Sequence, residues 1–391
     1  MSPAAIDADL LHRLRARLAA DGQQVTPTAV AAALRSEAGL VGDEVVLDVV
    51  DALRRESVGA GPLEPLLARP GVTDVLVNGP AEVYVDDGRG LIRTEVRFPD
   101  DASVRRLAQR LAATAGRRLD DASPFVDVPL PDGTRFHAVL APVARPGTCL
   151  SLRVPARAGM SLADLEAAGA VSPDAAAILS ALVDSRVPFL VSGGTGSGKT
   201  TLLGAMLARV DARHRIVIAE DMRELRPDHP HVVSLEARSA NVEGAGGVTL
   251  RDLVRQALRM RPDRLVVGEV RGAEVVDLLA ALNTGHEGGC GTVHANAPAD
   301  VPARLEALGV AAGLSREAVH AQVAAGLAAV VHLRRDAGGC RWVSEVGVVQ
   351  RAGALVEVTP AIVFDLPGRR SNERRPAEPA GRLLEAILGQ G

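Results

Sequence analysis

The residues that decide the fold of this chain are Gly193-Gly194-Thr195-Gly196-Ser197-Gly198-Lys199-Thr200-Thr201. From Gly193 to Thr200 they fit the Walker A spacing G-x-x-x-x-G-K-[ST]. Lys199 is the one lysine among the 44 Lys and Arg residues, so every other basic position is an arginine. A compact ammonium on a thin stem can reach between the β- and γ-phosphates of a nucleotide, whereas a planar guanidinium is too wide for that place. The segment from Gly193 to Thr201 therefore predicts a binding site for a nucleoside triphosphate.

The sequence on both sides of this loop supports the prediction. A buried strand is expected over residues 187–191, and a helix from Lys199 to about Val210. Backbone N–H groups of the glycine-rich loop would surround the phosphates, and the helix would direct its positive end at them. Thr200 would hold Mg²⁺ through its hydroxyl, and Lys199 would bridge the β- and γ-oxygens. The expected cofactors are ATP and Mg²⁺.

A second element of the site is expected where the apolar strand Leu265 to Val267 ends in Gly268-Glu269. P-loop folds place a carboxylate after such a strand to anchor Mg²⁺, usually through water. Because the strand ends in Gly-Glu and not in Asp, this is an atypical Walker B, and Glu269 is the candidate residue. A surface carboxylate at a strand end is the alternative interpretation.

An acidic segment, Glu220-Asp221-Met222-Arg223-Glu224, follows the strand expected over residues 215–219. Clustered carboxylates beside a triphosphate repel one another and the ligand, so they need a function. Orienting or deprotonating the attacking water is that function, with Glu224 as first candidate and Glu220 as second. A solvated acidic turn is the alternative.

Two histidines, His286 and His294, flank a glycine-rich loop after the Walker B strand and are candidate sensors of the γ-phosphate. Histidines with ordinary loop partners are the alternative. A metal site formed by His286, Cys290 and His294 is not expected, because a fourth ligand at tight spacing is missing.

Arginine fingers are a further possibility, because multi-subunit P-loop machines often complete the site with an arginine from a neighbouring subunit. The candidates are Arg135 and Arg153 before the linker, and Arg255, Arg259 and Arg271 near the core. Arginine is so abundant in this chain that a solvated position is the default for any one of them.

The chain divides by pattern into five segments. Leucines at helical spacing predict an N-terminal helical region of three helices over 1–58, the second beginning at Thr26-Pro27. Short strands with turns predict a smaller α+β domain over 59–154, with strands at 72–77, 82–85, 136–140 and 150–154 and a helix at 104–115. Residues 155–160 form a linker, and the alternating strands and helices of 161–360 predict an α/β domain with a mostly parallel sheet. Residues 361–391 are expected to be a polar, arginine-rich tail that closes with a short amphipathic stretch.

Composition restricts the function classes. The net charge is −4 and aromatic residues are 2 % of the chain, which argues against a general nucleic-acid coat protein. Three cysteines without C-x-x-C spacing argue against a disulfide framework or a structural zinc site, so a reducing cytosol is expected. No apolar run approaches the ~18 residues that span a bilayer, and no signal-peptide pattern is present, so any membrane association is expected to be peripheral.

Together these segments resemble the traffic ATPases of type II and type IV secretion, specifically the CpaF-like branch that assembles tight-adherence (Tad) and Flp pili. The resemblance covers roughly residues 59–349. It rests on segments 61–67, 72–80 and 130–135, the Walker A at 192–201, the acidic box at 220–225, the Walker B region at 257–271, and the His box at 282–288 and 292–296.

The resemblance implies a homo-hexameric ring in which a PAS-like N-terminal domain of one subunit caps the nucleotide on the RecA-like P-loop domain. It implies ATP hydrolysis coupled to displacement of an inner-membrane platform protein, at the inner face of the cytoplasmic membrane. By motif position, Glu224 takes the catalytic-carboxylate role, Glu269 the Walker B role, and His286 and His294 the His-box roles.

Two segments depart from the family pattern. Cys290-Gly291 stands where Leu-Ser or Leu-Thr is more usual, and Met222-Arg223 replaces a small or apolar pair in the acidic box. Neither change removes a catalytic group. The leading hypothesis is an ATP-driven assembly motor for a pilus or secretion apparatus. The alternatives are a nucleic-acid translocase or helicase and a regulatory subunit that hydrolyses ATP poorly. The net acidic charge and the low aromatic content argue against the first, and no specific nucleic acid is expected as a partner.

Overall fold

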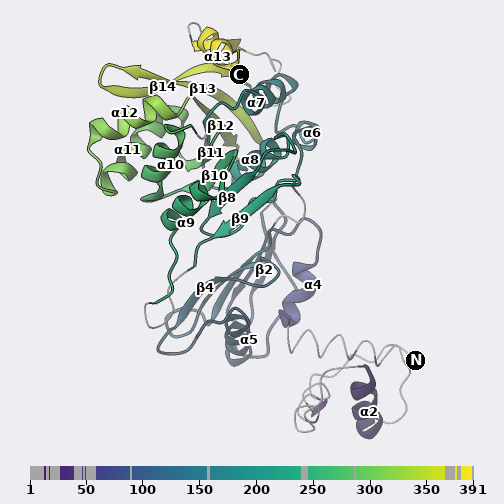
Figure 1. The fold of residues 1–391 in the computed structure, drawn as a ribbon. Helices are drawn as coiled ribbons and strands as arrows, with labels where there is room; N and C mark the ends of the chain where they lie inside the picture. Colours follow the sequence, from purple (N-terminus) through teal and green to yellow (C-terminus); the bar gives the residue numbers. More distant parts are fainter. Residues whose placement is uncertain are drawn as a thin grey trace. The chain divides into compact units, whose positions relative to one another are not determined.

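The structure, a computed structural model, describes residues 13–14, 17, 27–38, 46, 49, 59–88, 90–155, 159–238, 245–285, 288–365, 375–376 and 380–389. The chain divides into two compact units, Met1–Pro155 and Ala156–Gly391 (Figure 1). The division falls inside the linker expected at residues 155–160.

The first unit is built on a six-stranded sheet with the order β3-β2-β1-β6-β5-β4, and every neighbouring pair is antiparallel. One face of the sheet is buried, as the alternation along β1 shows, where Val75 and Val77 are fully covered. The sequence missed β3 and β4 and displaced the start of β1 by two residues. The strands are β1 (Asp74–Asn78), β2 (Val83–Asp86), β3 (Leu91–Arg93), β4 (Phe125–Pro129), β5 (Arg135–Val139) and β6 (Cys149–Arg153).

Helix α5 (Asp101–Thr114) shares the core of this unit with the sheet. Asp100 caps the helix by accepting a hydrogen bond from the Ser103 N–H, and apolar residues recur every three or four positions along its buried face. The turn η1 (Gly61–Leu63) and helix α4 (Glu64–Leu67) precede the sheet.

Helix α2 (Pro27–Ala38) confirms the helix predicted to begin at Thr26-Pro27. The other two helices expected in residues 1–58 lie almost entirely outside the described residues.

The second unit contains a nine-stranded mixed sheet with the order β15-β14-β13-β12-β7-β11-β10-β8-β9. From β12 to β9 all neighbours are parallel, whereas β13, β14 and β15 pair antiparallel. The predicted alternation of strands and helices is confirmed, while the names RecA-like and PAS-like stay predictions. The strands are β7 (Phe189–Gly193), β8 (Ile216–Glu220), β9 (Val232–Glu236), β10 (Arg264–Val270), β11 (Cys290–His294), β12 (Ala329–Arg335), β13 (Arg341–Ala352), β14 (Leu355–Val363) and β15 (Arg375–Pro376).

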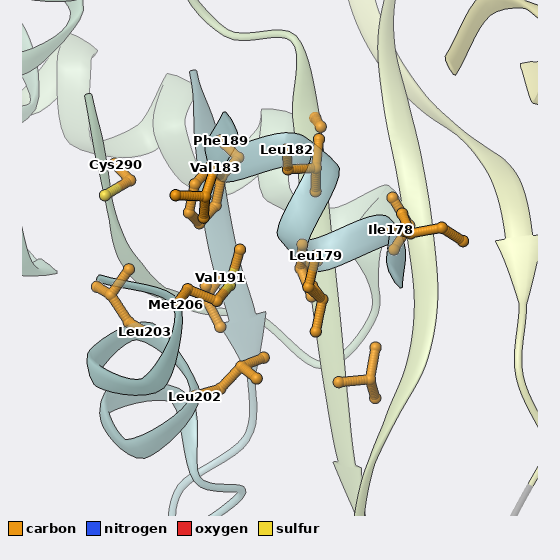
Figure 2. Packing of buried hydrophobic residues seen from close by; sticks show 14 of the residues in the cluster. Ile178, Leu179, Leu182, Val183, Phe189, Val191, Leu202, Leu203, Met206 and Cys290 are labelled. Atoms are coloured by element: carbon orange, nitrogen blue, oxygen red, sulfur yellow. The ribbon is translucent and has the colours of Figure 1, made fainter. Parts of the chain in front are cut away.

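Helices cover both faces of this sheet, so its central strands are apolar on both sides (Figure 1). Along β7, Phe189 and Val191 enter one core and Leu190 enters the other. Figure 2 shows the first core, where side chains of α7 and α8 surround β7. The helices of the first core are α6 (Leu162–Ala167), α7 (Pro173–Asp184), α8 (Lys199–Leu207) and α13 (Ala380–Leu388); those of the second are α9 (Leu250–Ala257), α10 (Glu274–Leu282), α11 (Val301–Ala311) and α12 (Arg316–Gly326). Two short 3₁₀ turns, η2 (Leu258–Met260) and η3 (Pro298–Asp300), follow α9 and precede α11.

The C-terminal boundary expected at residue 360 needs correction. It falls inside β14, and the buried Ile362 and Phe364 belong to the first core. Leu384 of α13 is buried in the same core, and Ser185 donates a hydrogen bond to the Leu388 carbonyl. The amphipathic end of the chain is therefore part of the second unit, because its apolar face covers the antiparallel extension of the sheet. Residues 366–374, which carry most of the tail's arginines, lie outside the described residues.

In the part of the chain that the structure describes, no helix combines the length and the apolar character that a bilayer crossing requires.

The first core makes a direct prediction about stability. Leu179→Ala, at a fully buried position of α7, should lower the free energy of unfolding by about 3 kcal/mol, because it removes apolar contacts and leaves a cavity. Leu355→Ala, at a partly exposed position of β14, is the matched control and should cost under about 1 kcal/mol. Urea denaturation of both variants measures the difference, and equal losses would contradict this account of the core.

Candidate active site

The parallel strands bring the predicted site residues to one edge of the second sheet. β7, β8, β10 and β11 run in the same direction, so their carboxyl ends meet at this edge. In register, His294 lies beside Gly193, while Val267 lies beside both Ala219 and Gly291. The glycine-rich loop, the acidic segment, Glu269 and His294 therefore emerge together, although they are separated by up to about a hundred residues along the chain.

The glycine-rich loop joins β7 directly to α8 and has glycine where a side chain cannot fit. A Cβ on Gly193 would lie 2.6 Å from Ser197 Oγ and 2.7 Å from the Leu333 carbonyl oxygen. Gly198, at the N-cap of α8, has φ of +95°, a conformation that favours glycine. The loop consequently folds back tightly over the start of the helix.

Lys199 lies inside this loop and is only 9 % exposed. Its Nζ donates to the carbonyl oxygens of Gly193 (3.1 Å) and Gly194 (3.0 Å). Burial lowers the pKa of Lys199, and the negative charges of Glu269 and Glu224 act against that shift. The Ser197 hydroxyl is also buried and has no hydrogen-bond partner within the described structure. A buried ammonium and an unsatisfied hydroxyl in one loop suit a polyanionic ligand that would bind both.

Thr200 and Glu224 connect the loop to the acidic segment. Thr200 Oγ1 donates to Glu224 Oε2 at 3.4 Å, and the Glu224 side chain is exposed. Glu224 is thus a carboxylate in solvent beside the first turn of α8, as its predicted role on the attacking water requires.

Glu220 has a different environment from Glu224. It is 3 % exposed, and its Oε1 accepts hydrogen bonds from the backbone N–H groups of Glu224 (3.1 Å) and Leu225 (3.0 Å). Burial raises its pKa to about 7, against the lowering effect of these two hydrogen bonds. A Cβ on Gly268 would lie 2.5 Å from Glu220 Cγ, so the glycine at this position of β10 provides the room for this side chain. The geometry therefore favours Glu220 as the residue that positions Glu224, and disfavours its role as the second candidate for contacting water.

Glu269 emerges from the end of β10 and forms an ion pair with Arg271. The hydrogen bond to Glu269 raises the pKa of Arg271, and the charges of Asp221 and Glu224 act in the same direction. Buried Glu274 holds the turn by accepting the N–H groups of Arg271 and Gly272. Arg271 is therefore the candidate arginine of this unit that lies among the site carboxylates.

The donor set fits a magnesium ion. Thr200 supplies a hydroxyl oxygen and Glu269 supplies carboxylate oxygens, which are the hard ligands that Mg²⁺ prefers together with nucleotide phosphates. Within the described ranges, no group of three or more His, Cys, Asp or Glu side chains is arranged to hold a metal ion. A shared site, part protein and part nucleotide, is the arrangement that these residues match.

Of the two predicted histidines, the structure describes His294. His294 ends β11 beside Gly193, at the edge where a γ-phosphate would lie. His286 lies outside the described residues. Gly289, which follows it, accepts a hydrogen bond from the Phe189 N–H at the amino end of β7, at the opposite edge of the sheet from the loop. Cys290 and His294 occupy opposite ends of β11, and burial raises the pKa of Cys290 to about 12, so a metal site that joins them is disfavoured.

The remaining arginine candidates all have partners. Arg135 and Arg153 lie opposite each other on β5 and β6 of the first unit, where they pair with Asp127 and Asp74. Arg255 of α9 pairs with Asp277. Arg259 donates to the Arg255 carbonyl oxygen. A finger role for these residues stays a prediction.

Sequence reasoning missed several residues that contact the loop. His332 of β12 is buried and lies 2.8 Å from the Ser192 hydroxyl through Nδ1, and it also forms a hydrogen bond with the Asn296 backbone. Burial lowers its pKa to about 4, so it is neutral at physiological pH. Arg341 and Arg335 lie against Gly196. A histidine inside the apolar run 329–333 was the one available signal for His332, and nothing in the sequence singled out these two arginines.

Comparisons with known proteins show what this chain is similar to. The family model described as type II/IV secretion system protein matches residues 56–357. A putative conjugal transfer protein of Mycobacterium tuberculosis is 59 % identical over 324 residues, which cover 81 % of this chain and 92 % of that protein. The conjugal transfer protein TrbB of Rhizobium radiobacter is 30 % identical over 275 residues, covering 69 % of this chain and 81 % of TrbB.

Among solved structures, the Legionella pneumophila ATPase DotB is similar with a TM-score of 0.54. The match covers 73 % of this chain and 79 % of DotB at 21 % identity. At this identity, the likeness concerns the fold.

The buried carboxyl of Glu220 predicts a pH dependence of stability. Its pKa rises from 4.5 to about 7 on folding, so ionisation opposes folding: the penalty is absent below pH 4.5, grows from pH 4.5 to 7 and is constant above pH 7. Glu220→Gln keeps an acceptor for the two N–H groups and cannot ionise. The free energy of unfolding of this variant relative to the wild type should therefore rise by about 3 kcal/mol across that window.

Denaturant titrations at several pH values measure this difference. Glu357→Gln, which removes an exposed carboxyl from β14, is the matched control. A wild-type-to-Glu220→Gln difference that stays level from pH 4.5 to 7 would show that Glu220 is not held as described.

Proposed function

This chain belongs to the type II/IV secretion system protein family, and on that premise we propose that it is an ATP-hydrolysing motor for a pilus or secretion apparatus. One observation carries the proposal: a glycine-rich loop holding Lys199 and two carboxylates, Glu224 and Glu269, converge at one edge of a parallel sheet. This is the arrangement in which P-loop enzymes transfer the γ-phosphoryl group to water.

Different residues bind the phosphates and activate the water. Lys199 exchanges its two loop carbonyls for oxygens of the β- and γ-phosphates, while the N–H groups of the loop and of α8 hold the remaining charge. Glu224 orients a water molecule and accepts its proton as the water oxygen bonds to the γ-phosphorus. The bond from that phosphorus to the bridging oxygen of ADP breaks, which leaves ADP and inorganic phosphate. A magnesium ion held by Thr200, Glu269 and the phosphates would supply charge neutralisation.

The site around Glu224 is preorganised by buried groups. Glu220 accepts a hydrogen bond from the Glu224 backbone N–H. His332 forms hydrogen bonds with the Ser192 hydroxyl, near the end of β7, and with the backbone of Asn296, two residues after His294. His294 is placed to contact the γ-phosphate and to respond to its loss. The hydrogen bonds of His332 thus connect β12, the end of β7 and the segment after β11.

The finer assignment rests on the family resemblance. It comprises a homo-hexamer, assembly of a Tad or Flp type of pilus, action on inner-membrane platform proteins, and peripheral association with the inner face of the cytoplasmic membrane. In that assignment Arg135 and Arg153 act as fingers from the first unit of a neighbouring subunit.

A nucleic-acid translocase is the second candidate, because relatives of this chain are named conjugal transfer proteins. The net charge of −4 and the 2 % aromatic content disfavour it, since single strands are usually bound by basic grooves and aromatic stacking. Strong stimulation of ATPase activity by single-stranded DNA would support this candidate over the assembly motor.

Steady-state ATPase assays test the proposed activity. Lys199→Ala and Glu224→Gln should each lower kcat at least about 100-fold, because the first removes phosphate charge stabilisation and the second removes the proton acceptor. Glu357→Gln, an exposed change three strands away from β7, should keep wild-type turnover. If the wild type and both site variants hydrolyse ATP at the background rate, the chain is not an ATPase motor.

Ring formation is tested by size. With a nonhydrolysable ATP analogue at micromolar protein concentration, light scattering should give about six times the chain mass of 40.6 kDa. A monomer both with and without the analogue would contradict the hexamer while leaving the hydrolysis assay unaffected.

A further inference from the structure

The hairpin formed by β12 and β13 ends beside the glycine-rich loop. β12 is parallel to β7 with Leu333 opposite Gly193, so Arg335, two residues later, lies alongside the loop that follows Gly193. Arg335 and Arg341 face each other across the two strands. The turn between them is closed by Asp336, which accepts the Cys340 N–H through its carboxylate and donates to the Cys340 carbonyl. Both arginines are therefore held at the tip of a closed hairpin.

Both side chains reach the loop itself. Arg341 Nε donates to the Gly196 carbonyl oxygen at 2.8 Å, and its Cδ would lie 3.7 Å from a Cβ on Gly198. A Cβ on Gly196 would lie 3.2 Å from Arg335 Nη1. Gly196 has φ of +69°, a left-handed conformation that glycine adopts readily, and Arg341 holds its carbonyl oxygen.

The hydrogen bond from Arg341 fixes the direction of a loop N–H group. In a trans peptide the C=O and the following N–H point in opposite directions. Because Arg341 holds the Gly196 carbonyl toward the hairpin, the Ser197 N–H is directed into the loop, where it reaches the Gly194 carbonyl at 3.4 Å. That is a weak hydrogen bond, so the N–H is available to a stronger acceptor such as a phosphate oxygen.

The two arginines also leave their charge unpaired. Within the described residues, neither Arg335 nor Arg341 forms an ion pair with a carboxylate, although both side chains are exposed. Other arginines of this unit do form such pairs, namely Arg209, Arg213, Arg251, Arg255, Arg271 and Arg316. Two unpaired cations against a loop that already encloses Lys199 create a local field that favours a polyanion.

We propose that the β12–β13 hairpin is a basic arm of the nucleotide site, in which Arg341 positions the loop and Arg335 contributes charge toward the phosphates. The ligand class is a nucleoside di- or triphosphate, recognised through its phosphates. The inference rests on the proposed function, because it assigns these arginines to the same nucleotide.

Binding of ADP carrying a fluorescent ribose label, with competition by unlabelled tripolyphosphate, tests the arm in the full chain. Arg341→Ala should weaken ADP binding about tenfold, the loss expected for one charge-assisted hydrogen bond. Arg341→Lys keeps the charge without Nε and should recover part of the affinity. Arg335→Ala should weaken binding by about threefold and make it less sensitive to salt.

The matched control is Arg351→Ala, an exposed arginine on β13 ten residues from Arg341, which is ~33 Å along the strand. In the hydrolysis assay, Arg341→Ala should raise KM about tenfold and change kcat by less than about threefold, with an unchanged midpoint of thermal unfolding. That separation between KM and kcat would not arise from a general loss of structure.

The binding experiment distinguishes failure of the proposed function from failure of the basic arm. A wild-type chain that binds no ADP refutes the proposed function. If the wild type binds ADP, and Arg341→Ala and Arg335→Ala bind it as tightly as Arg351→Ala does, the basic arm is refuted and the proposed function is unaffected. If both variants lose ADP affinity but bind tripolyphosphate as the wild type does, the arginines contact the base or ribose, and the assignment to the phosphates is wrong. Should Arg341→Ala not fold, Arg341→Lys and Arg335→Ala decide the question.

Discussion

The parallel register of β7, β8, β10 and β11 is the constraint on which the candidate site depends. Hydrogen bonds between these strands place Gly193 beside His294, and Ala219 beside Val267. Because each strand is apolar on both faces and covered by helices, a one-residue shift in register would exchange the side chains that enter the two cores and disrupt the packing of both. The polar residues that follow each strand therefore lie together at the carboxyl edge of the sheet.

Burial of ionisable groups accompanies that arrangement. Lys199, Glu220 and His332 are all nearly inaccessible and all have shifted pKa values. Each has hydrogen-bond partners in the loop, the acidic segment or the neighbouring strand, and these partners offset only part of the cost of burial, as the shifted pKa values show. Glu224, by contrast, stays exposed and keeps access to water. Of these two carboxylates, which lie four residues apart, Glu220 positions the backbone of Glu224, and Glu224 is the one that would act on water.

Much of the fold and site could be predicted from the sequence, because their signals are local. The glycine-rich loop with its lysine, the apolar strand before Glu269 and the period of α5 each lie within a short window, and the structure has the expected strands and helices there. The short, exposed strand β3 was missed because its three residues show no alternation. The end of the second unit was misjudged because the apolar stretch of α13 follows a polar, arginine-rich segment, and only its packing on β14 shows where it belongs.

The sequence by itself determined that a glycine-rich loop with a single lysine joins a buried strand to a helix, and which carboxylates could accompany that loop, because loop conformation and residue chemistry are encoded over a few consecutive positions. Only the tertiary structure decided that Glu220 is buried beneath Glu224, that His332 joins Ser192, and that Arg341 contacts Gly196 across 145 positions of the chain. The reason is physical: burial and long-range hydrogen bonds are set by strand order and register, and those depend on every apolar residue of the core at once.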